Sequence, residues 1–306
     1  MISNRLVACL FLLGGNLFSL AFEPPEKHCT ALKEQGYVEI EDTSYLQEDY
    51  RRLYRSFDRF IEQMTQDELS FQEMRSSETE FLSSEKLKNR YCGTPPSYRD
   101  PRQDFQKKHR KIYFQFINEH YTLLKNNHPG LFQKNAEFFE EMMKIDTSAR
   151  TIYSALFENI DGDCSKIEET LYGKHSNLTI VSKIVRYEQS QDWGTSPHFD
   201  KSGLSLVWDS SDANYNCFVL DINTAEPSLN QLRKPKRTFI GAQKSTSVIL
   251  IPGLCLSKVK INIHPTLHAV LPLEQPYRYA VISFVLVPDI DTKDMATDFV
   301  PTKDEL

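Results

Sequence analysis

The sequence predicts an α+β fold in which N-terminal helices pack on a double-stranded β-helix, or jelly roll. The first half holds segments with apolar residues at spacings of three and four, which is typical of amphipathic helices. From about Thr179 onward the pattern switches to short apolar runs separated by turn residues, which is typical of an all-β unit. At 306 residues with 40% hydrophobic content, the chain is long enough to bury one large core.

Four helices are expected in the first half. In the first of them Tyr50, Leu53 and Phe57 belong to an apolar stripe, and Ser44 with Gln47 gives a capping-box pattern at its start. The cluster Asn-Asn-His-Pro-Gly at 126–130 separates the second helix from the third, because proline and glycine interrupt helices. The predicted helices are 44–69, 104–126, 131–145 and 148–160.

Five strands are expected in the second half. Each is a short run rich in β-branched and aromatic residues between turn residues, and the last run is the strongest by composition. The predicted strands are 179–187, 204–208, 217–220, 247–251 and 280–287.

His198 and Asp200 form the first half of a predicted metal site. Side chains at positions i and i+2 of an extended strand point to the same face, so these two can bind one ion. His268 supplies the third ligand. Two imidazoles and one carboxylate leave one face of an Fe(II) ion open for a co-substrate and oxygen, the arrangement called a facial triad. His264 competes with His268 for the third position, and the spacing to Arg278 favours His268.

Arg278 leads directly into the last predicted strand. Its planar guanidinium can bind a carboxylate through two parallel hydrogen bonds. An arginine in the same cavity as the metal is therefore a natural partner for the distal carboxylate of a co-substrate. The proposed ligand is 2-oxoglutarate.

With these residues in this order, the chain resembles the isopenicillin N synthase-like branch of the Fe(II)/2-oxoglutarate-dependent dioxygenases. That family carries a tyrosine-bearing strand, then His-x-Asp, then a distal histidine, and finally Arg-x-Ser. The matching positions are Tyr187 in the strand 183–187, His198 with Asp200, His268, and Arg278-Tyr279-Ala280. The segment 32–40 and the helix after it resemble the family's N-terminal region more loosely.

Ala280 departs from the family pattern. The family's serine helps the arginine to hold the distal carboxylate of 2-oxoglutarate, and an alanine side chain cannot donate a hydrogen bond. Either Tyr187 or another hydroxyl takes the place of that serine, or the co-substrate differs. The resemblance thus implies metal ligands at His198, Asp200 and His268, and co-substrate contacts at Arg278 and Tyr187.

The resemblance also implies an activity. The protein would use Fe(II), 2-oxoglutarate and O2 to hydroxylate or otherwise oxidise a C–H bond, with release of succinate and CO2. Its partner would be a small-molecule or peptide substrate that the sequence does not identify. The alternative is a non-catalytic jelly-roll binding protein that keeps the fold, with or without the metal.

The two ends of the chain predict the compartment in which the protein resides. Residues 1–21 have the pattern of a signal peptide and are too short and too interrupted for a membrane span. The chain ends in Lys-Asp-Glu-Leu at 303–306, which predicts the endoplasmic reticulum lumen in a eukaryote, while a bacterial source would mean the periplasm or secretion. The predicted division is 1–21 leader, 22–175 mostly helical region, 176–290 oxygenase core and 291–306 tail.

Charge and cysteine content add two expectations. A formal net charge of -6 gives no basic footprint for nucleic acid, so a nucleic-acid partner is not expected. Removal of the leader takes away Cys9 and leaves an odd number of cysteines, so at least one is free or intermolecular.

Overall fold

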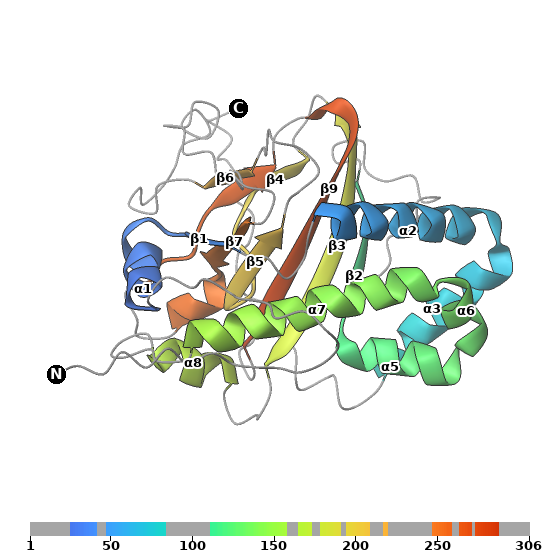
Figure 1. Ribbon diagram of the computed structural model, residues 1–306, viewed down its shortest axis with the longest axis horizontal. Helices are drawn as coiled ribbons and strands as arrows, with labels where there is room; N and C mark the ends of the chain where they lie inside the picture. The colour runs from blue at the N-terminus through green and yellow to red at the C-terminus, as the bar shows by residue number, and fades with distance from the viewer. Residues whose placement is uncertain are drawn as a thin grey trace, which may run out of the picture.

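Helices cover one face of a large antiparallel sheet in the computed structural model of the protein (Figure 1). This mixture of helices and antiparallel strands agrees with the α+β class expected from the sequence. The structure describes residues 25–41, 47–83, 111–157, 165–172, 178–190, 194–208, 217–219, 247–258, 263–270 and 273–287. The predicted leader and the C-terminal tail lie outside these residues.

All the α-helices in the described residues precede residue 175. They are α1 Pro25–Glu34, α2 Gln47–Gln66, α3 Glu68–Ser83, α5 Asn118–Asn127, α6 Pro129–Lys134, α7 Ala136–Phe157 and α8 Ser165–Tyr172. The 3-10 helix η2 Leu254–Lys258 follows later in the chain. Asp67 separates α2 from α3, because its Oδ1 accepts hydrogen bonds from the backbone N–H groups of Leu69 (3.1 Å) and Ser70 (3.2 Å) and so caps α3. Pro129 begins α6, within the cluster expected to interrupt the helices.

The strands form two antiparallel sheets. They are β1 Val38–Glu41, β2 Lys111–Phe116, β3 Thr179–Ser190, β4 Thr195–His198, β5 Leu204–Trp208, β6 Cys217–Val219, β7 Ser247–Pro252, β8 His268–Val270 and β9 Leu273–Leu286. The large sheet has the order β1-β7-β5-β9-β3-β2, and the small sheet has the order β4-β8-β6. In Figure 1, α3 and α6 lie at the right-hand side of the picture, far from β4 and β6.

The predicted helix 104–126 is wrong over residues 111–116, which form strand β2 and pair with β3. Ile112, Phe114 and Phe116 face the helical core, whereas Tyr113 packs on the other side of the sheet. The period of two and the pairing with β3 therefore override a pattern that also fits a helix. The helix begins only at Asn118, and residues 104–110 lie outside the described chain.

Two further helix boundaries differ from the prediction. The predicted helices 131–145 and 148–160 are replaced by α6 and one continuous helix, α7. No proline or glycine lies between residues 136 and 157, so nothing in the sequence breaks the helix there. The predicted helix 44–69 corresponds to α2, which ends earlier, at Gln66, because Asp67 caps the next helix, α3.

The main core lies between the helices and the large sheet, and α2 and α7 run across that face (Figure 1). An aromatic cluster joins the two layers. Phe60 of α2 stacks on Phe138 of α7 with ring centroids 4.7 Å apart, and it meets Phe114 of β2 edge-on at 5.5 Å. Burial of each such ring contributes about 1.5–3 kcal/mol, so this contact holds the helices against the sheet.

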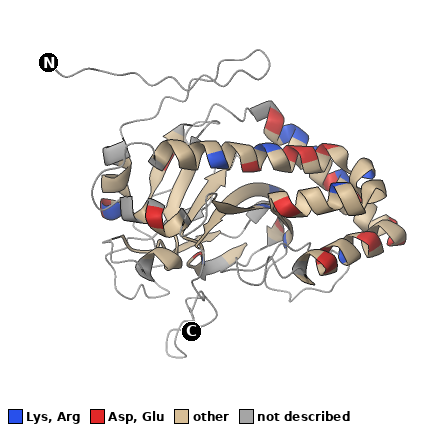
Figure 2. Ribbon diagram, turned by 90° about the horizontal axis from the view of Figure 1, so that it is seen from below, with Lys and Arg blue, Asp and Glu red and all other residues tan. Residues whose placement is uncertain are grey.

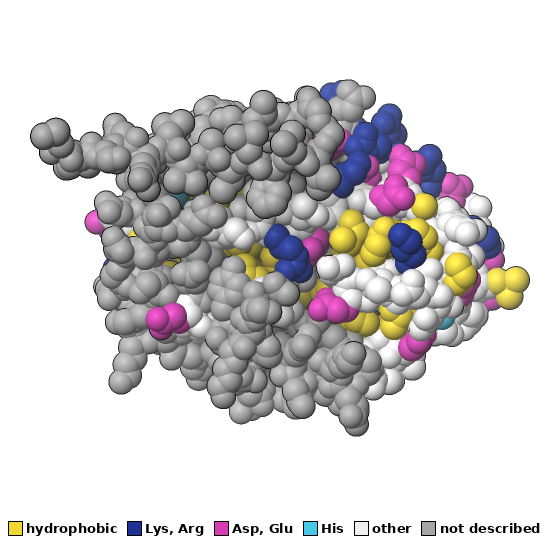
Figure 3. Space-filling model, turned by 60° about the horizontal axis from the view of Figure 1, so that its bottom comes forward, with side chains coloured by type: hydrophobic (Ala, Val, Ile, Leu, Met, Phe, Trp, Pro, Cys, Tyr) yellow, Lys and Arg dark blue, Asp and Glu magenta, His cyan; other side chains and the backbone are white. Residues whose placement is uncertain are grey.

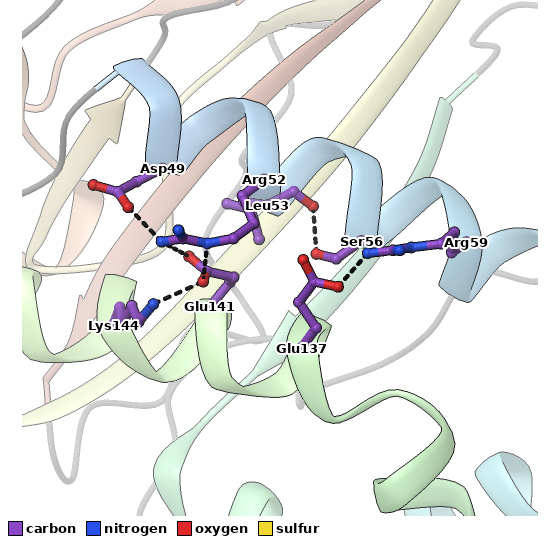
Figure 4. A network of polar contacts seen from close by, with 8 residues as sticks. All are labelled: Asp49, Arg52, Leu53, Ser56, Arg59, Glu137, Glu141 and Lys144. Carbon is purple, nitrogen blue, oxygen red and sulfur yellow. Dashed lines mark hydrogen bonds and ion pairs between the residues drawn. The ribbon is translucent and has the colours of Figure 1, made fainter.

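Charged pairs join α2 to α7 above this apolar layer (Figure 4). Arg52 donates from Nε to Oε1 of Glu141 at 2.6 Å, and Lys144 Nζ lies 2.7 Å from the same oxygen. Glu141 is buried, and a buried carboxylate requires partners of this kind. Farther along the same two helices, Arg59 pairs with Glu137.

The outer surface of the helices carries charges of both signs. Figure 2 shows acidic and basic residues along the helices, whereas the strands between them are mostly uncharged. On the described part of the face in Figure 3, apolar side chains lie between lysine, arginine and acidic side chains. Within the described residues, no helix combines the length and apolar character needed to cross a bilayer.

His120 of α5 is a buried histidine inside this core. Its ring lies 4.9 Å from the ring of Phe81 and 6.1 Å from that of Phe114, and Ser77 Oγ is 3.5 Å from its Nε2. Burial, together with the charge of His128, lowers the pKa of His120 to about 3. The imidazole is therefore neutral in the folded protein throughout the physiological range.

This histidine predicts a loss of stability in mild acid. Because its pKa is about 6.5 in the unfolded chain, the unfolded state takes up a proton below that pH that the folded state cannot bind. The stability conferred by the neutral ring is present above pH 6.5 and declines as the pH falls toward the folded pKa. We expect a loss of about 2 kcal/mol between pH 7.5 and pH 5 from this group, measured by urea unfolding. His120→Gln should lose less over the same interval, and parallel pH profiles for the two proteins would contradict this assignment.

Candidate metal centre

His198, Asp200 and His268 come together beside the small sheet. Oδ1 of Asp200 lies 3.5 Å from Nε2 of His198 and 3.6 Å from Nε2 of His268. One ligand atom from each residue lies within 4.8 Å of the others. The structure thus brings together the three residues that the sequence singled out, whereas His264 is exposed and lies outside this group.

The pairing of β4 with β8 positions the two histidines. His198 ends β4, His268 begins β8, and the two are direct partners across the antiparallel ladder. Directly opposed residues point to the same face of a sheet, and the two imidazole centroids are 4.3 Å apart. A register shift lies between Thr195 and His198, so the end of β4 is irregular where it presents the first ligand.

Asp200 lies in the loop between β4 and β5, and backbone hydrogen bonds hold this loop. The Asp200 carbonyl accepts from the N–H of Leu254 at 2.8 Å, and the Ser202 carbonyl accepts from Cys255 at 3.1 Å. Gly253 donates to the carbonyl of Gly203 at 2.8 Å. These bonds attach the carboxylate-bearing loop to the segment that follows β7.

Thr266 orients His268, and sequence reasoning did not identify it. His268 Nδ1 lies 3.0 Å from the Thr266 carbonyl, so Nδ1–H donates there and Nε2 keeps its lone pair for a metal. The Thr266 hydroxyl in turn donates to the Gly36 carbonyl at 2.5 Å. Gly36 has a φ of 76°, a conformation that favours glycine. A threonine two residues before a histidine gives no recognisable sequence signal for this role.

Arg278 and Tyr187 lie on neighbouring strands of the large sheet. They are direct partners between β3 and β9, and the Arg278 guanidinium carbon is 5.9 Å from the centre of the Tyr187 ring. Both side chains are buried. Tyr187 belongs to an apolar cluster with Val185 and Ala280, and Val270 of the small sheet packs against this cluster, so this face of the large sheet looks toward the small sheet.

Solved structures with the same fold place this site in context. The sequence matches no protein-family model and no curated protein. The structure is similar to that of dioxygenase for auxin oxidation 1 from Arabidopsis thaliana in a binary complex with 2-oxoglutarate, with a TM-score of 0.56, 13% identity and 92% of each chain covered. It is also similar to a full-length Neurospora crassa protein in complex with alpha-KG, with a TM-score of 0.52, 13% identity and coverage of 87% of this chain and 79% of that one.

A third match is JOX2 in complex with 2OG, Fe and JA, with a TM-score of 0.52, 13% identity, and coverage of 92% of this chain and 74% of that one. The protein has the fold of the 2-oxoglutarate-dependent dioxygenases. At this identity the likeness extends to the dioxygenase fold alone.

The donor set of this dioxygenase-fold site suits a divalent metal ion. Imidazole nitrogen and carboxylate oxygen bind such ions at about 2.0–2.2 Å, which places neighbouring ligands of one ion about 3 Å apart. The separations of 3.5 and 3.6 Å need only small side-chain rotations to reach that spacing. The Thr266 contact supplies the outer hydrogen bond that metal-binding histidines usually make.

The charges at this site already favour an anionic carboxylate between two imidazoles. Burial raises the pKa of Asp200, but the charge of His268 and hydrogen bonds from both histidines outweigh burial and leave the pKa well below its usual range. For His268, burial lowers the pKa, but the charge of Asp200 and the hydrogen bonds raise it overall. Asp200 can therefore bind a cation without first losing a proton, whereas a His268 that is protonated beside Asp200 has to release its Nε2 proton when the cation binds.

The position of Gly253 beside the Asp200 loop leaves no room for a side chain. A Cβ atom at Gly253 would lie 2.2 Å from the backbone oxygen of Ser202, so any side chain forces the backbone around Asp200 to move. We expect Gly253→Ala to weaken Mn(II) binding about tenfold to a hundredfold, the usual range for a disturbed outer partner of a metal ligand, as measured by calorimetry. Gly130→Ala is the matched control, because its Cβ would meet nothing within 4 Å. Equal Mn(II) affinity in both variants would contradict this role for Gly253.

Proposed function

We propose that this protein is an Fe(II)- and 2-oxoglutarate-dependent oxygenase. His198, Asp200 and His268 would hold the iron, and Arg278 would bind the distal carboxylate of 2-oxoglutarate with help from Tyr187. With O2, the bound iron and 2-oxoglutarate would supply the oxidation of a substrate C–H bond, with release of succinate and CO2. The convergence of three ligand atoms within 4.8 Å of one another carries this proposal.

The chain's own residues have separable tasks in this proposal. The Thr266 carbonyl keeps Nδ1 of His268 protonated so that Nε2 faces the metal. The Arg278 side chain is buried, with 3% of its surface exposed. Its planar guanidinium can bind a carboxylate through two charge-assisted hydrogen bonds, which are strong where water is largely excluded. Asp200 provides the third ligand, and a carboxylate in that position leaves no coordination site there for a halide. Hydroxylation is therefore favoured over halogenation.

We further propose that the two sheets are the two sides of a double-stranded β-helix. Support comes from the strand order: β3, β5, β7 and β9 belong to the large sheet, while β4, β6 and β8 belong to the small one. Successive strands thus alternate between sheets, as winding of a double strand requires. In this proposal the core spans residues 176–290, and the preceding region, 22–175, supports it from one side.

The proposed address is the lumen of the endoplasmic reticulum if the source is eukaryotic, and the periplasm or the exterior if it is bacterial. The leader 1–21 and the tail motif 303–306, on which this rests, lie outside the described residues. Cys29 is disulfide-bonded, which supports an oxidising compartment, and Cys255 is a buried thiol that forms no disulfide. Such an address favours a protein or peptide substrate.

A binding protein without oxidative turnover is the second candidate. Ala280 favours it, because the hydroxyl that the family pattern places two residues after the arginine is missing. The two candidates differ in whether 2-oxoglutarate and oxygen are consumed.

Succinate formation separates these candidates. The chain from residue 22 onward, supplied with Fe(II), ascorbate, O2 and 2-oxoglutarate, should release succinate, measured by mass spectrometry. His198→Ala should abolish release because it removes a metal ligand. Arg278→Ala should raise the 2-oxoglutarate concentration needed at least about tenfold, because a charge-assisted hydrogen bond to the carboxylate is lost. Wild-type rates from both variants would contradict the proposed roles, whereas bound iron without succinate from the parent protein would favour the binding-protein candidate.

A further inference from the structure

Lys111, Tyr187 and Arg278 form a row across three adjacent strands. Lys111 of β2 is the direct partner of Tyr187 on β3, which is the direct partner of Arg278 on β9. Directly opposed residues project to the same face. Two residues along, Tyr113 packs against the apolar cluster that contains Tyr187 and Ala280, and Val270 of the small sheet packs against the same cluster. The face that carries the row therefore looks toward the small sheet that holds the metal-site histidines.

Two hydrogen bonds connect Lys111 to Tyr187 through the small sheet. Nζ of Lys111 donates to Oγ1 of Thr195 at 3.1 Å, and the Thr195 hydroxyl donates to the Tyr187 hydroxyl oxygen at 3.4 Å. Thr195 begins β4, the strand that ends at His198. In this pair the Tyr187 hydroxyl oxygen is the acceptor, and the positive charge of Lys111 polarises both hydroxyls.

The row lies beside Ala280, the position at which the family pattern has a serine hydroxyl. Ala280 is on the same face of β9 as Arg278, two residues away, and belongs to the same apolar cluster as Tyr187. It cannot donate to an anion held by the arginine. The hydroxyls of Tyr187 and Thr195 belong to the same side of the large sheet, and Lys111 donates to Thr195. The site therefore has hydroxyl donors and a second positive charge in place of a serine.

We propose that Lys111, held by Thr195, is a specificity-determining residue that makes this site select a 2-oxo acid with a distal carboxylate. This inference rests on the proposed oxygenase function. Lys111 and Arg278 flank Tyr187 and supply two positive charges, and the hydroxyls of Tyr187 and Thr195 replace the absent serine. A monocarboxylic 2-oxo acid would reach the metal in the same way but would gain nothing from Lys111.

A second lysine on the same sheet provides a matched control. Lys183 lies on β3, four residues before Tyr187, and its Nζ sits 4.4 Å from the centre of the Tyr113 ring. Four residues of strand correspond to about 13 Å, so Lys183 is too far away to join the row. Lys183→Met removes the same charge from the same strand surface without touching the proposed contacts.

The test compares two ligands on the Mn(II)-loaded chain from residue 22 onward, by calorimetry. Both 2-oxoglutarate and pyruvate can chelate a metal through the 2-oxo acid group, but only 2-oxoglutarate has a distal carboxylate. We expect Lys111→Met to weaken 2-oxoglutarate binding about tenfold, because the positive charge and the hydrogen-bonded connection through Thr195 to Tyr187 are lost together, and to change pyruvate binding by less than about twofold. Thr195→Val should act in the same direction, and Lys183→Met should match the parent protein.

A rescue variant tests the replacement of the missing serine. In the Lys111→Met background, Ala280→Ser restores a hydroxyl next to Arg278 and should recover most of the lost 2-oxoglutarate affinity. Lys111→Arg should retain it, since the positive charge is kept. Unchanged Mn(II) affinity in every variant shows that the metal site is intact.

Each other outcome overturns a defined part of this inference. If the parent protein prefers 2-oxoglutarate and Lys111→Met keeps that preference, Lys111 has no role in selection, while the proposed function stands. Equal weakening of both ligands would show that Lys111 acts on the fold or the metal and not on the distal carboxylate. If the parent protein binds Mn(II) but neither acid, the proposed function fails and the inference fails with it.

Discussion

The antiparallel pairing of β4 with β8 is the constraint on which the site depends. It sets His198 opposite His268, although neither strand exceeds four residues. Strands this short cannot hold a fixed geometry through their own ladder. The bonds around Asp200 and the contact of Thr266 with Gly36 therefore fix the ligands from outside the small sheet. The metal site is built from residues far apart in sequence, so its precision rests on the packing of the whole domain.

The large sheet separates two environments, and this explains how a polar site exists beside a large apolar core. Along β9, Tyr279 and Val281 face the helical core, whereas Arg278 and Ala280 face the small sheet. Strands β2 and β3 follow the same alternation in register. Burial on the helical side stabilises the sheet, which leaves the other face able to hold charged groups. A shift of one residue in this register would exchange the two faces.

Short-range rules explain what the sequence could predict. The i and i+2 relation of His198 to Asp200 and the apolar runs of β5 and β7 are local properties, and the structure brings the predicted residues together. Strand β2 could not be predicted in this way, because its identity depends on pairing with β3, which is distant in the chain. The roles of Thr266 and Gly253 depend on backbone atoms of other segments, and side-chain types carry no signal for such contacts.

The central claim is that one iron ion binds between His198, Asp200 and His268. Anomalous diffraction at the iron absorption edge, from crystals grown with Fe(II) without oxygen, tests it directly. The account predicts one strong peak about 2.0–2.2 Å from Nε2 of each histidine and from a carboxylate oxygen of Asp200. No peak at this position, or a peak bound only by other residues, would contradict it.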